Sequence, residues 1–361
     1  MKKLLIAVLA IAGLASCTNS DVEFEPQQKQ IGLNAITQNR TRAMVDGTAF
    51  PAEDFKVWAW YKQVDPATSI AEWQGATTVD QQDYINNKVF TKKSTNTVWS
   101  GATPYYWPKL GSLLFAGYYP TSVANVTYKF DDDENVMTIS GYTPGDYTTT
   151  GFVTTNETHT EDLMYFKMTP SSVNCATTDA TDVDVTFQHA LAWIKVTLAE
   201  AAGTPDGATI TVSSVKFTGV NTTGTGTVAD EDNDGDVEDI AWEVTSATAD
   251  IEVLTSGVVL APANAEGKGA LVANQPIVIP QEMGGNLVIT YTITAADNSE
   301  FTEVKTITLN TLKDNAATPN TIDKWEAGKC YTYAIVIGTE EILIDPIVTK
   351  WDDVTVPVEV E

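Results

Sequence analysis

The chain has 361 residues and a formal net charge of −27 at pH 7. This acidity argues against nucleic acid as a partner, because no basic patch is available to collect phosphates. The chain is also long for a single hydrophobic core, so two domains are expected. Its abundant Thr and its many Val and Ile residues favour strands, since branched side chains fit a pleated surface.

The first expected elements are a signal peptide over residues 1–16 and a polar tether over residues 17–30. Two lysines precede an apolar run that ends at Leu14. This run is too short to span a bilayer and is typical of a secretory signal. Small residues then lead into Cys17, in a sequence that looks like a bacterial lipobox. We expect Cys17 to be lipidated and to anchor the chain outside the cytoplasm; the alternative is an ordinary signal with an incidental cysteine.

Short hydrophobic runs separated by turns follow the tether, and they predict an all-β protein. The first candidate strand covers residues 31–36, and aromatic strands are expected at 56–61 and 113–119. Over residues 287–294, apolar residues alternate with threonines, as in an antiparallel strand with one wet face. Turns rich in Gly, Asn, Asp and Pro recur about every ten residues, which is typical of β-sandwiches.

A polar stretch between residues 170 and 186 predicts a boundary between two domains. We expect an N-terminal β-sandwich over residues 31–180 and a C-terminal β-sandwich over 181–361. The second of these ends in tail strands over residues 340–361.

The sequence contains no recognisable catalytic motif, and we expect a protein without enzymatic activity. Its only histidines are His159 and His189, and His189 opens a candidate strand in which a structural role is expected. No zinc-binding helix motif, nucleophile elbow or phosphate loop occurs. Cys175 and Cys330 lie far apart, and the sequence leaves open whether they form a disulfide.

One acidic run matches the first half of a calcium-binding loop. Its aspartates alternate and Gly235 follows them, so oxygen ligands can wrap a Ca²⁺ ion. The twelfth position is Ala241, however, and not the bidentate Glu, so a solvated hairpin loop is the alternative. The candidate calcium ligands are Asp230, Asp232, Asp234 and Asp236. No other cofactor is expected.

A set of aromatic residues is expected to pack in the core and at the edges of a β-sandwich. The alternative is a platform that stacks on sugars. The residues of this aromatic set are Trp58, Trp60, Tyr61, Tyr105, Tyr106, Trp107, Tyr118 and Tyr119.

Several segments together resemble the fimbrillin family, the major and accessory pilins of Bacteroidales surface fimbriae. These segments follow the family's order and, with the lipobox, span nearly the whole chain. They are residues 106–108, 114–120, 162–165, 187–196, 279–281, 325–333 and 347–351. The resemblance implies two transthyretin-like antiparallel β-sandwich domains, and export as a lipoprotein to the cell outer membrane.

The resemblance also implies activation by an arginine-specific protease outside the cell. Cleavage in this family removes the lipidated leader with the first strand, and a strand from a neighbouring subunit fills the groove that opens. Here Arg40 and Arg42 follow the first candidate strand, and Arg42-Ala43 matches the family's cleavage context best. The removable strand is expected within residues 31–42, and its apolar residues are Ile31, Leu33 and Ile36.

The C-terminal tail supplies a candidate donor strand, because its valines alternate with other residues. An ordinary final strand pair of the second domain is the alternative. The donor residues are Val354, Val356, Val358 and Val360.

The expected function is that of a stalk-type pilin in a surface fimbria that supports adhesion. The expected partners are other fimbrillin subunits in a homo- or hetero-polymer, the outer membrane through the lipid of the precursor, and a host or bacterial surface receptor. An anchor or tip fimbrillin, and a monomeric glycan-binding surface lipoprotein, are the alternatives that the sequence leaves open.

Overall fold

The computed structural model is all-β, which confirms the expected fold class. The only helix among the described residues is the single 3₁₀ turn Leu309–Thr311. The structure describes residues 29–37, 50, 53–62, 82–92, 98–108, 112–130, 135–144, 162–167, 182–229, 240–262, 269–272, 275–314, 318–339 and 342–350. The transthyretin-like character of the domains stays a prediction.

Within the described ranges, no helix has the length and hydrophobicity that crossing a membrane requires.

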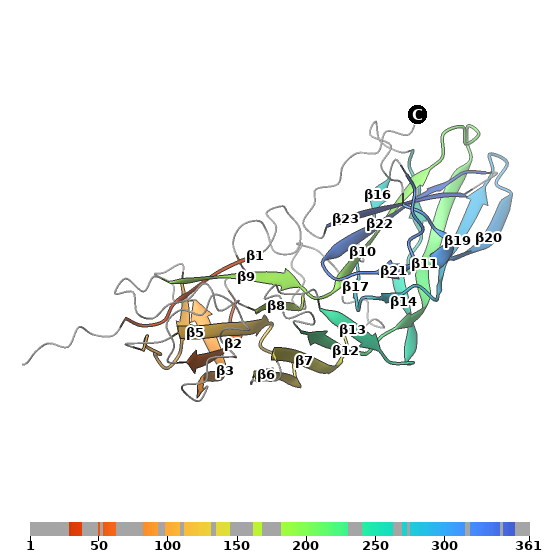
Figure 1. Ribbon diagram of the computed structural model, residues 1–361. Helices are drawn as coiled ribbons and strands as arrows, with labels where there is room; N and C mark the ends of the chain where they lie inside the picture. The colour runs from red at the N-terminus through yellow and green to blue at the C-terminus, as the bar shows by residue number, and fades with distance from the viewer. Residues whose placement is uncertain are drawn as a thin grey trace, which may run out of the picture.

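Seven strands form a closed barrel at one end of the elongated molecule, in the order β1-β4-β3-β2-β5-β8-β9 (Figure 1). The ring closes because β1 pairs in parallel with β9 and antiparallel with β4. The strands are β1 Leu33–Thr37, β2 Phe55–Lys62, β3 Gln82–Lys92, β4 Trp99–Gly101, β5 Ser112–Tyr119, β8 Met164–Lys167 and β9 Val183–His189.

Aromatic rings fill the barrel. Phe50 stacks on Phe187 with ring centroids 4.1 Å apart, and it meets Phe55 edge-on at 5.3 Å. All three side chains are almost completely buried. Such rings bury a large apolar area each, so they dominate the packing energy of the barrel.

A four-stranded antiparallel sheet, in the order β13-β12-β7-β6, packs against the outside of the barrel. Successive residues of β2 alternate between the two cores: Val57 faces the barrel interior, and Trp58 faces the four-stranded sheet. This strand is therefore buried on both faces. The sheet consists of β6 Val126–Phe130, β7 Asn135–Tyr142, β12 Gly224–Val228 and β13 Ala241–Val244.

Strands from both sides of residue 180 share sheets. Strand β9 completes the barrel, and β12 pairs with β7 of the first half of the chain. A domain division at residue 180 stays a prediction. The pairings show that a unit built around the barrel includes β9, β12 and β13.

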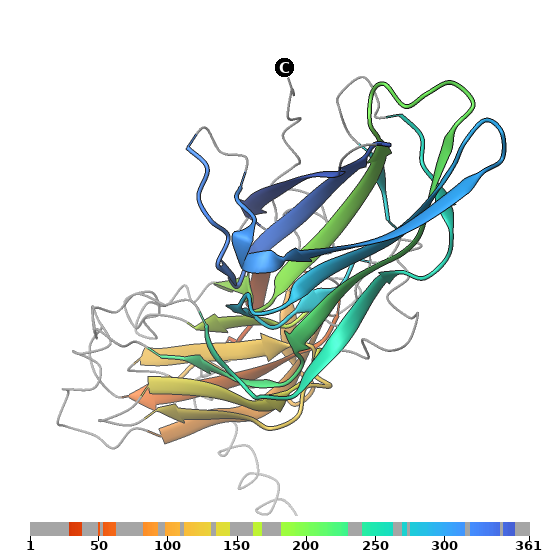
Figure 2. The same ribbon diagram turned by 90° about the vertical axis from the view of Figure 1, so that its right-hand side faces the viewer.

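Two further sheets form a sandwich at the other end of the molecule, and Figure 2 shows its blue and green strands above the orange and yellow strands of the barrel. One sheet has the order β16-β10-β22-β23, with β17 also pairing with β10. The other has the order β14-β11-β19-β20, with β15 also pairing with β11. The strands are β10 Ala192–Glu200, β11 Thr209–Asn221, β14 Thr248–Leu254, β15 Val258–Val259, β16 Ala270–Leu271, β17 Ile277–Val278, β19 Asn286–Thr294, β20 Glu300–Thr308, β22 Lys329–Ile337 and β23 Ile342–Lys350. The short strands β18 Gln281–Glu282 and β21 Lys324–Trp325 pair only with each other.

The alternation expected over residues 287–294 is present in β19, where Leu287, Ile289 and Tyr291 are buried between the two sheets of the sandwich. On the facing sheet, the Tyr333 hydroxyl accepts a hydrogen bond from Trp325 Nε1 at 2.9 Å. Both side chains are buried, and burial raises the pKa of Tyr333 far above its ordinary value. A buried polar group must find a partner inside the protein, so this pair fixes how β21 sits on β22.

Replacing Tyr333→Phe should lower the free energy of unfolding by about 1–3 kcal/mol, because the Trp325 N–H then stays buried without an acceptor. Urea unfolding followed by tryptophan fluorescence measures the loss. Tyr106→Phe is the matched control, since Tyr106 is 43% exposed and its change should fall within about 0.5 kcal/mol of zero. Equal effects of the two changes would contradict the assigned role of the Trp325–Tyr333 bond.

Candidate functional site

The first candidate strand of the sequence corresponds to β1, which is one of the strands of the barrel. It pairs in parallel with β9 from Leu33–Val183 to Thr37–Phe187. On its other side Leu33 pairs with Trp99 of β4, and Ile31 N–H donates to the Tyr105 carbonyl at 2.8 Å. The segment around β1 is thus held between two strands that have no direct pairing with each other.

The side chains of β1 alternate between the barrel interior and its outer surface. Ile31, Leu33 and Ala35 are buried at 1%, 0% and 3% exposure and belong to the barrel core. Ile36 lies on the opposite face and is half-buried. The buried row of this strand is therefore Ile31, Leu33 and Ala35, with Ala35 in place of Ile36.

Neighbouring side chains approach the backbone closely at Gly32, just before β1. A Cβ atom on Gly32 would lie 2.5 Å from both Asp182 Oδ1 and Val98 Cγ1, so only glycine fits without displacing a neighbour. On the outer face of β1, Asn34 Nδ2 donates to Asp184 Oδ1 at 2.8 Å. These contacts fix the register of β1 against β9.

Removing β1 would convert the closed barrel into an open sheet, because β1 alone links β4 to β9 in the ring. The exposed edges would carry unpaired backbone N–H and C=O groups beside an apolar groove. Such an edge is a template for pairing with a strand from another chain.

Several sequence-predicted sites lie outside the described residues. These are the lipidation residue Cys17, the cleavage residues Arg40, Arg42 and Ala43, the candidate calcium ligands Asp230, Asp232, Asp234 and Asp236, and the donor residues Val354, Val356, Val358 and Val360. His159 and Cys175 also lie outside them. In the part of the chain that the structure describes, no cluster of His, Cys, Asp or Glu is arranged to hold a metal ion.

His189 forms a buried pair with Asp162, with 2.8 Å between His189 Nδ1 and Asp162 Oδ2. The two residues are 7% and 1% exposed. The pair joins the end of β9 to the segment that leads into β8. Cys330 is a buried free thiol in β22, and burial raises its pKa.

Most of the aromatic set packs in the core, as expected, and does not form a sugar platform. Five of its eight members are buried: Trp58, Trp60, Trp107, Tyr118 and Tyr119. They pack inside the barrel or between the barrel and the four-stranded sheet. Strands β2 and β5 are covered on both faces, which an isolated aromatic run does not reveal.

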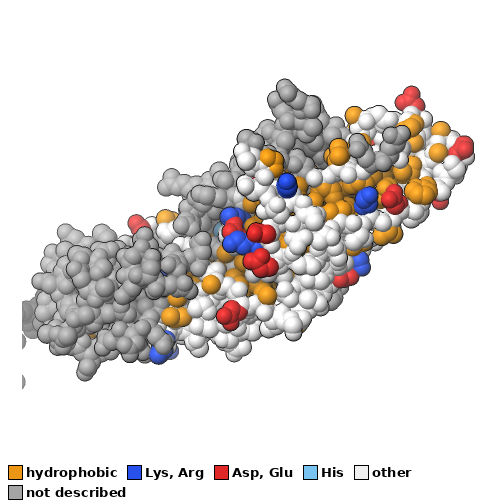
Figure 3. Space-filling model, turned by 45° about the vertical axis from the view of Figure 1, so that its right-hand side comes forward, with side chains coloured by type: hydrophobic (Ala, Val, Ile, Leu, Met, Phe, Trp, Pro, Cys, Tyr) orange, Lys and Arg blue, Asp and Glu red, His pale blue; other side chains and the backbone are white. Residues whose placement is uncertain are grey.

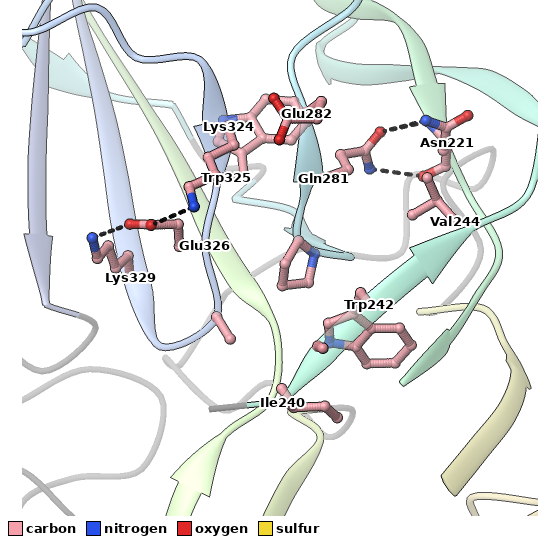
Figure 4. Close-up of a pocket in the computed structure, with 13 residues that line it drawn as sticks. Asn221, Ile240, Trp242, Val244, Gln281, Glu282, Lys324, Trp325, Glu326 and Lys329 are labelled. Carbon is pink, nitrogen blue, oxygen red and sulfur yellow. Dashed lines mark hydrogen bonds and ion pairs between the residues drawn. The ribbon is translucent and has the colours of Figure 1, made fainter. Parts of the chain in front are cut away.

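A cavity of about 550 Å³ lies where β13 meets the β18–β21 pair (Figure 4). It lies between the sheet outside the barrel and the C-terminal sandwich. In Figure 4, the indole of Trp242 lies across the cavity from a charged group on the side of β21 and β22. The sequence reasoning missed this cavity, since its walls come from segments far apart in the chain.

Trp242 is held from three directions. Its indole Nε1 donates to the Ala190 carbonyl at 2.8 Å, and its ring meets Tyr142 with centroids 5.8 Å apart. The ring lies against β12, because a Cβ on Gly226 would be 3.0 Å from two of its carbons and one on Gly224 would be 3.3 Å from a third. The sequence contains a Gly-x-Gly pattern at residues 224–226 and a tryptophan at 242. Only the pairing of β12 with β13 shows that they lie opposite each other.

The charged group consists of Glu326 between two lysines. Lys324 Nζ lies 3.2 Å from Glu326 Oε1, and Lys329 Nζ bonds the other carboxylate oxygen. Burial opposes the charge of Glu326, but the hydrogen bonds from both lysines outweigh it and lower the pKa of this carboxyl group. The bond to Glu326 in turn raises the pKa of Lys324. The bonds therefore favour the charged forms of Glu326 and Lys324.

Gln281 lines the cavity and is bonded at both ends of its amide. Its Oε1 accepts from the Asn221 backbone N–H at 2.8 Å, and its Nε2 donates to the carbonyls of Asn221 and Ile279, each at 3.0 Å. With both ends of its amide bonded, Gln281 fixes the turn after β11 against β18. It is a positioning residue for the cavity.

Comparison with known families gives one match. The sequence profile of a family described as "Fimbrillin-like" matches residues 41–351. No protein among the curated sequences matches this chain.

Solved structures also resemble this chain. A fimbrial protein from Bacteroides vulgatus ATCC 8482 is 16% identical, with a TM-score of 0.58 and coverage of 89% of this chain and 99% of that one. A candidate cell adhesion protein from Bacteroides uniformis ATCC 8492 is 17% identical, with a TM-score of 0.45 and coverage of 91% and 100%. The tip fimbrial protein Mfa3 from Porphyromonas gingivalis is 10% identical, with a TM-score of 0.36 and coverage of 90% and 100%. At this identity the first likeness shows the fold alone.

Proposed function

Because the chain belongs to the fimbrillin-like family, we propose that it is a stalk-type structural subunit of a bacterial surface fimbria. It is exported as a lipoprotein precursor attached at Cys17, with the outer membrane as its first location. Cleavage after Arg42 then releases the lipid and β1 together, and Arg40 is the alternative cleavage residue. Subunits assemble by donating a strand into the groove that β1 leaves, and the resulting fibre supports adhesion.

The observation that supports this proposal most directly is the position of β1. It is short, it closes the barrel alone, and its buried face presents Ile31, Leu33 and Ala35 to the core. A replacement strand needs the same two properties: backbone groups that pair with β9 and small or medium apolar side chains at alternate positions. The alternating valines at 354–360 have this pattern.

The position of Phe50 favours a cut between β1 and the rest of the chain. Phe50 is 1% exposed and stacks on Phe187 inside the barrel. Arg42 lies in sequence between Thr37, the end of β1, and this buried ring. A cut there frees β1 and leaves the new N-terminal segment attached through Phe50.

The outer strand of the C-terminal sandwich offers a second surface suited to contact between subunits. Phe301 and Val304 on the edge strand β20 are 61% and 59% exposed. Phe301 pairs with Ile293 and Val304 with Thr290, so the two exposed side chains lie on opposite faces of the sheet at its edge. Figure 3 shows a hydrophobic strip over the strands of this sandwich. Exposed apolar side chains on an unpaired edge are typical of a surface that another chain covers.

Assembled fibres should contain chains that begin at Ala43. Fibres are sheared from cells and their subunits sequenced from the N-terminus, and Arg42→Ala should leave uncut precursor that begins at the lipidated Cys17. Arg40→Ala is the matched control and should leave the cut at Arg42 intact. A start at Cys17 in assembled wild-type fibres would contradict cleavage as the activating step.

Locking β1 in place should block assembly even after cleavage. Asn34 and Asp184 are cross-strand partners on the outer face of the barrel, so the pair Asn34→Cys and Asp184→Cys can form a disulfide across the two strands. The oxidised double variant should be cut at Arg42 and stay monomeric by size-exclusion chromatography, and reductant should restore polymers.

The single variant Asn34→Cys serves as the control for the disulfide. It should polymerise both with and without reductant. If the oxidised double variant forms polymers as the wild type does, release of β1 is not needed for assembly.

Deleting residues 351–361 should abolish polymerisation of a stalk subunit, because the donor strand is lost. The deletion begins after Lys350, since β23 pairs with β22 along its whole length and belongs to the sandwich fold. Electron microscopy of the cleaved protein gives the result. A truncated chain that still forms homopolymers would contradict the tail as donor. A truncated chain that is incorporated only at a fibre end, where it stops growth, would identify an anchor subunit.

A further inference from the structure

We propose that the cavity between β13 and the β18–β21 pair is a carbohydrate-binding site, in which a neutral sugar ring stacks on Trp242 and the Lys324–Glu326–Lys329 group bonds its hydroxyls. The site is separate from the groove of β1, and none of the β1 residues lines it. It gives the protein a recognition function that does not depend on the strand-exchange proposal.

The aromatic wall of the cavity is preorganised. One face of the Trp242 indole is covered by the glycines of β12, and its N–H is bonded to the Ala190 carbonyl. The bonded N–H opposes rotation of the ring, and Trp242 lines the cavity in this fixed position. An aromatic face carries partial negative charge, so it attracts the polarised C–H groups on the apolar side of a sugar ring. Fixing the ring before binding removes an ordering cost from the association.

The opposite wall supplies what the hydroxyl side of a sugar needs. Glu326 accepts hydrogen bonds, and the two lysines donate them. Figure 4 shows Glu326 between Lys324 and Lys329, with Trp242 across the space from them. A ligand with one apolar face and one polar face matches this division, and a sugar ring is such a ligand.

The charge balance of the cavity favours a neutral ligand. Lys324 and Lys329 are offset by Glu326 and by Glu282, which also lines the cavity. The chain as a whole carries −27, so its field repels anions and gives no advantage to sialylated or sulfated sugars. The proposed ligand class is therefore a neutral oligosaccharide.

Size and location agree with a binding site for a small molecule. The volume of about 550 Å³ lies within the roughly 300–1,000 Å³ that such sites occupy. Pockets for small ligands also form preferentially where separate structural units meet, as β13 and β18–β21 do. Gln281 fixes β18 against the end of β11 at this junction through its bonds to Asn221.

The test uses soluble protein from residue 18 onward on an array of immobilised neutral, sialylated and sulfated oligosaccharides. Affinity for the best neutral glycan is then measured by isothermal titration calorimetry. We expect binding to neutral glycans and a loss of about tenfold or more for Trp242→Ala, as for tryptophan hot spots at other binding surfaces. Trp242→Phe should keep part of the affinity, because it keeps a flat ring.

Gly226→Ala tests the geometry without removing the ring. Its new Cβ would lie 2.8 Å from Ile240 Cδ1 and 3.0 Å from the indole, so the ring must tilt, and affinity should fall. Gly284→Ala is the matched control, since a Cβ there meets nothing within 4 Å. Near-UV circular dichroism and the thermal midpoint establish that each variant is folded.

Tyr106→Ala removes an exposed aromatic residue from a different surface and should bind as the wild type does. The proposal is overturned by absence of glycan binding, by a preference for sialylated or sulfated glycans, or by full affinity in Trp242→Ala. It is also overturned if Tyr106→Ala loses affinity as much as Trp242→Ala does. Trp242→Ala should still polymerise after cleavage, so failure of the sugar site and failure of strand exchange give different results.

Discussion

Closure of the barrel by β1 is the constraint on which the rest of the N-terminal unit depends. This strand alone connects β4 to β9, and it begins beside Gly32, where a Cβ would press on the side chains of Asp182 and Val98. While β1 is in place, β4 and β9 each have it as a paired neighbour and the aromatic core of the barrel is buried. One short strand near the start of the chain therefore carries the closure.

Burial on both faces of β2 and β5 connects the barrel to the rest of the molecule. Val57 lies in the barrel core and Trp58 lies under the four-stranded sheet. The four-stranded sheet therefore buries its inner face by packing against the barrel. Strands β12 and β13 complete that sheet from the second half of the chain. This return of the chain carries Trp242 to the junction with the C-terminal sandwich, and the cavity follows from it.

The sequence predicted individual strands well where neighbouring residues alternate between apolar and polar. Residues 287–294 alternate because one face of β19 is buried and the other is wet, and the strand is present as expected. The strand at residues 33–37 was expected, but its buried face, formed by Leu33 and Ala35 with the preceding Ile31, was not predicted. The aromatic set was expected to pack in the core, and most of it does. A run such as Trp58-Ala59-Trp60 does not show by itself whether its outer face meets solvent or a second sheet.

By itself, the sequence determined the all-β fold and the family, because strand periodicity and family-ordered segments are properties of neighbouring residues along the chain. It also supplied the lipobox cysteine and the arginines after the first strand as predictions. Only the tertiary structure decided that β1 closes a barrel and that Trp242 lies on Gly224 and Gly226 across from Glu326. Those relations depend on strand register and sheet order, which are set by packing between segments that are distant in sequence.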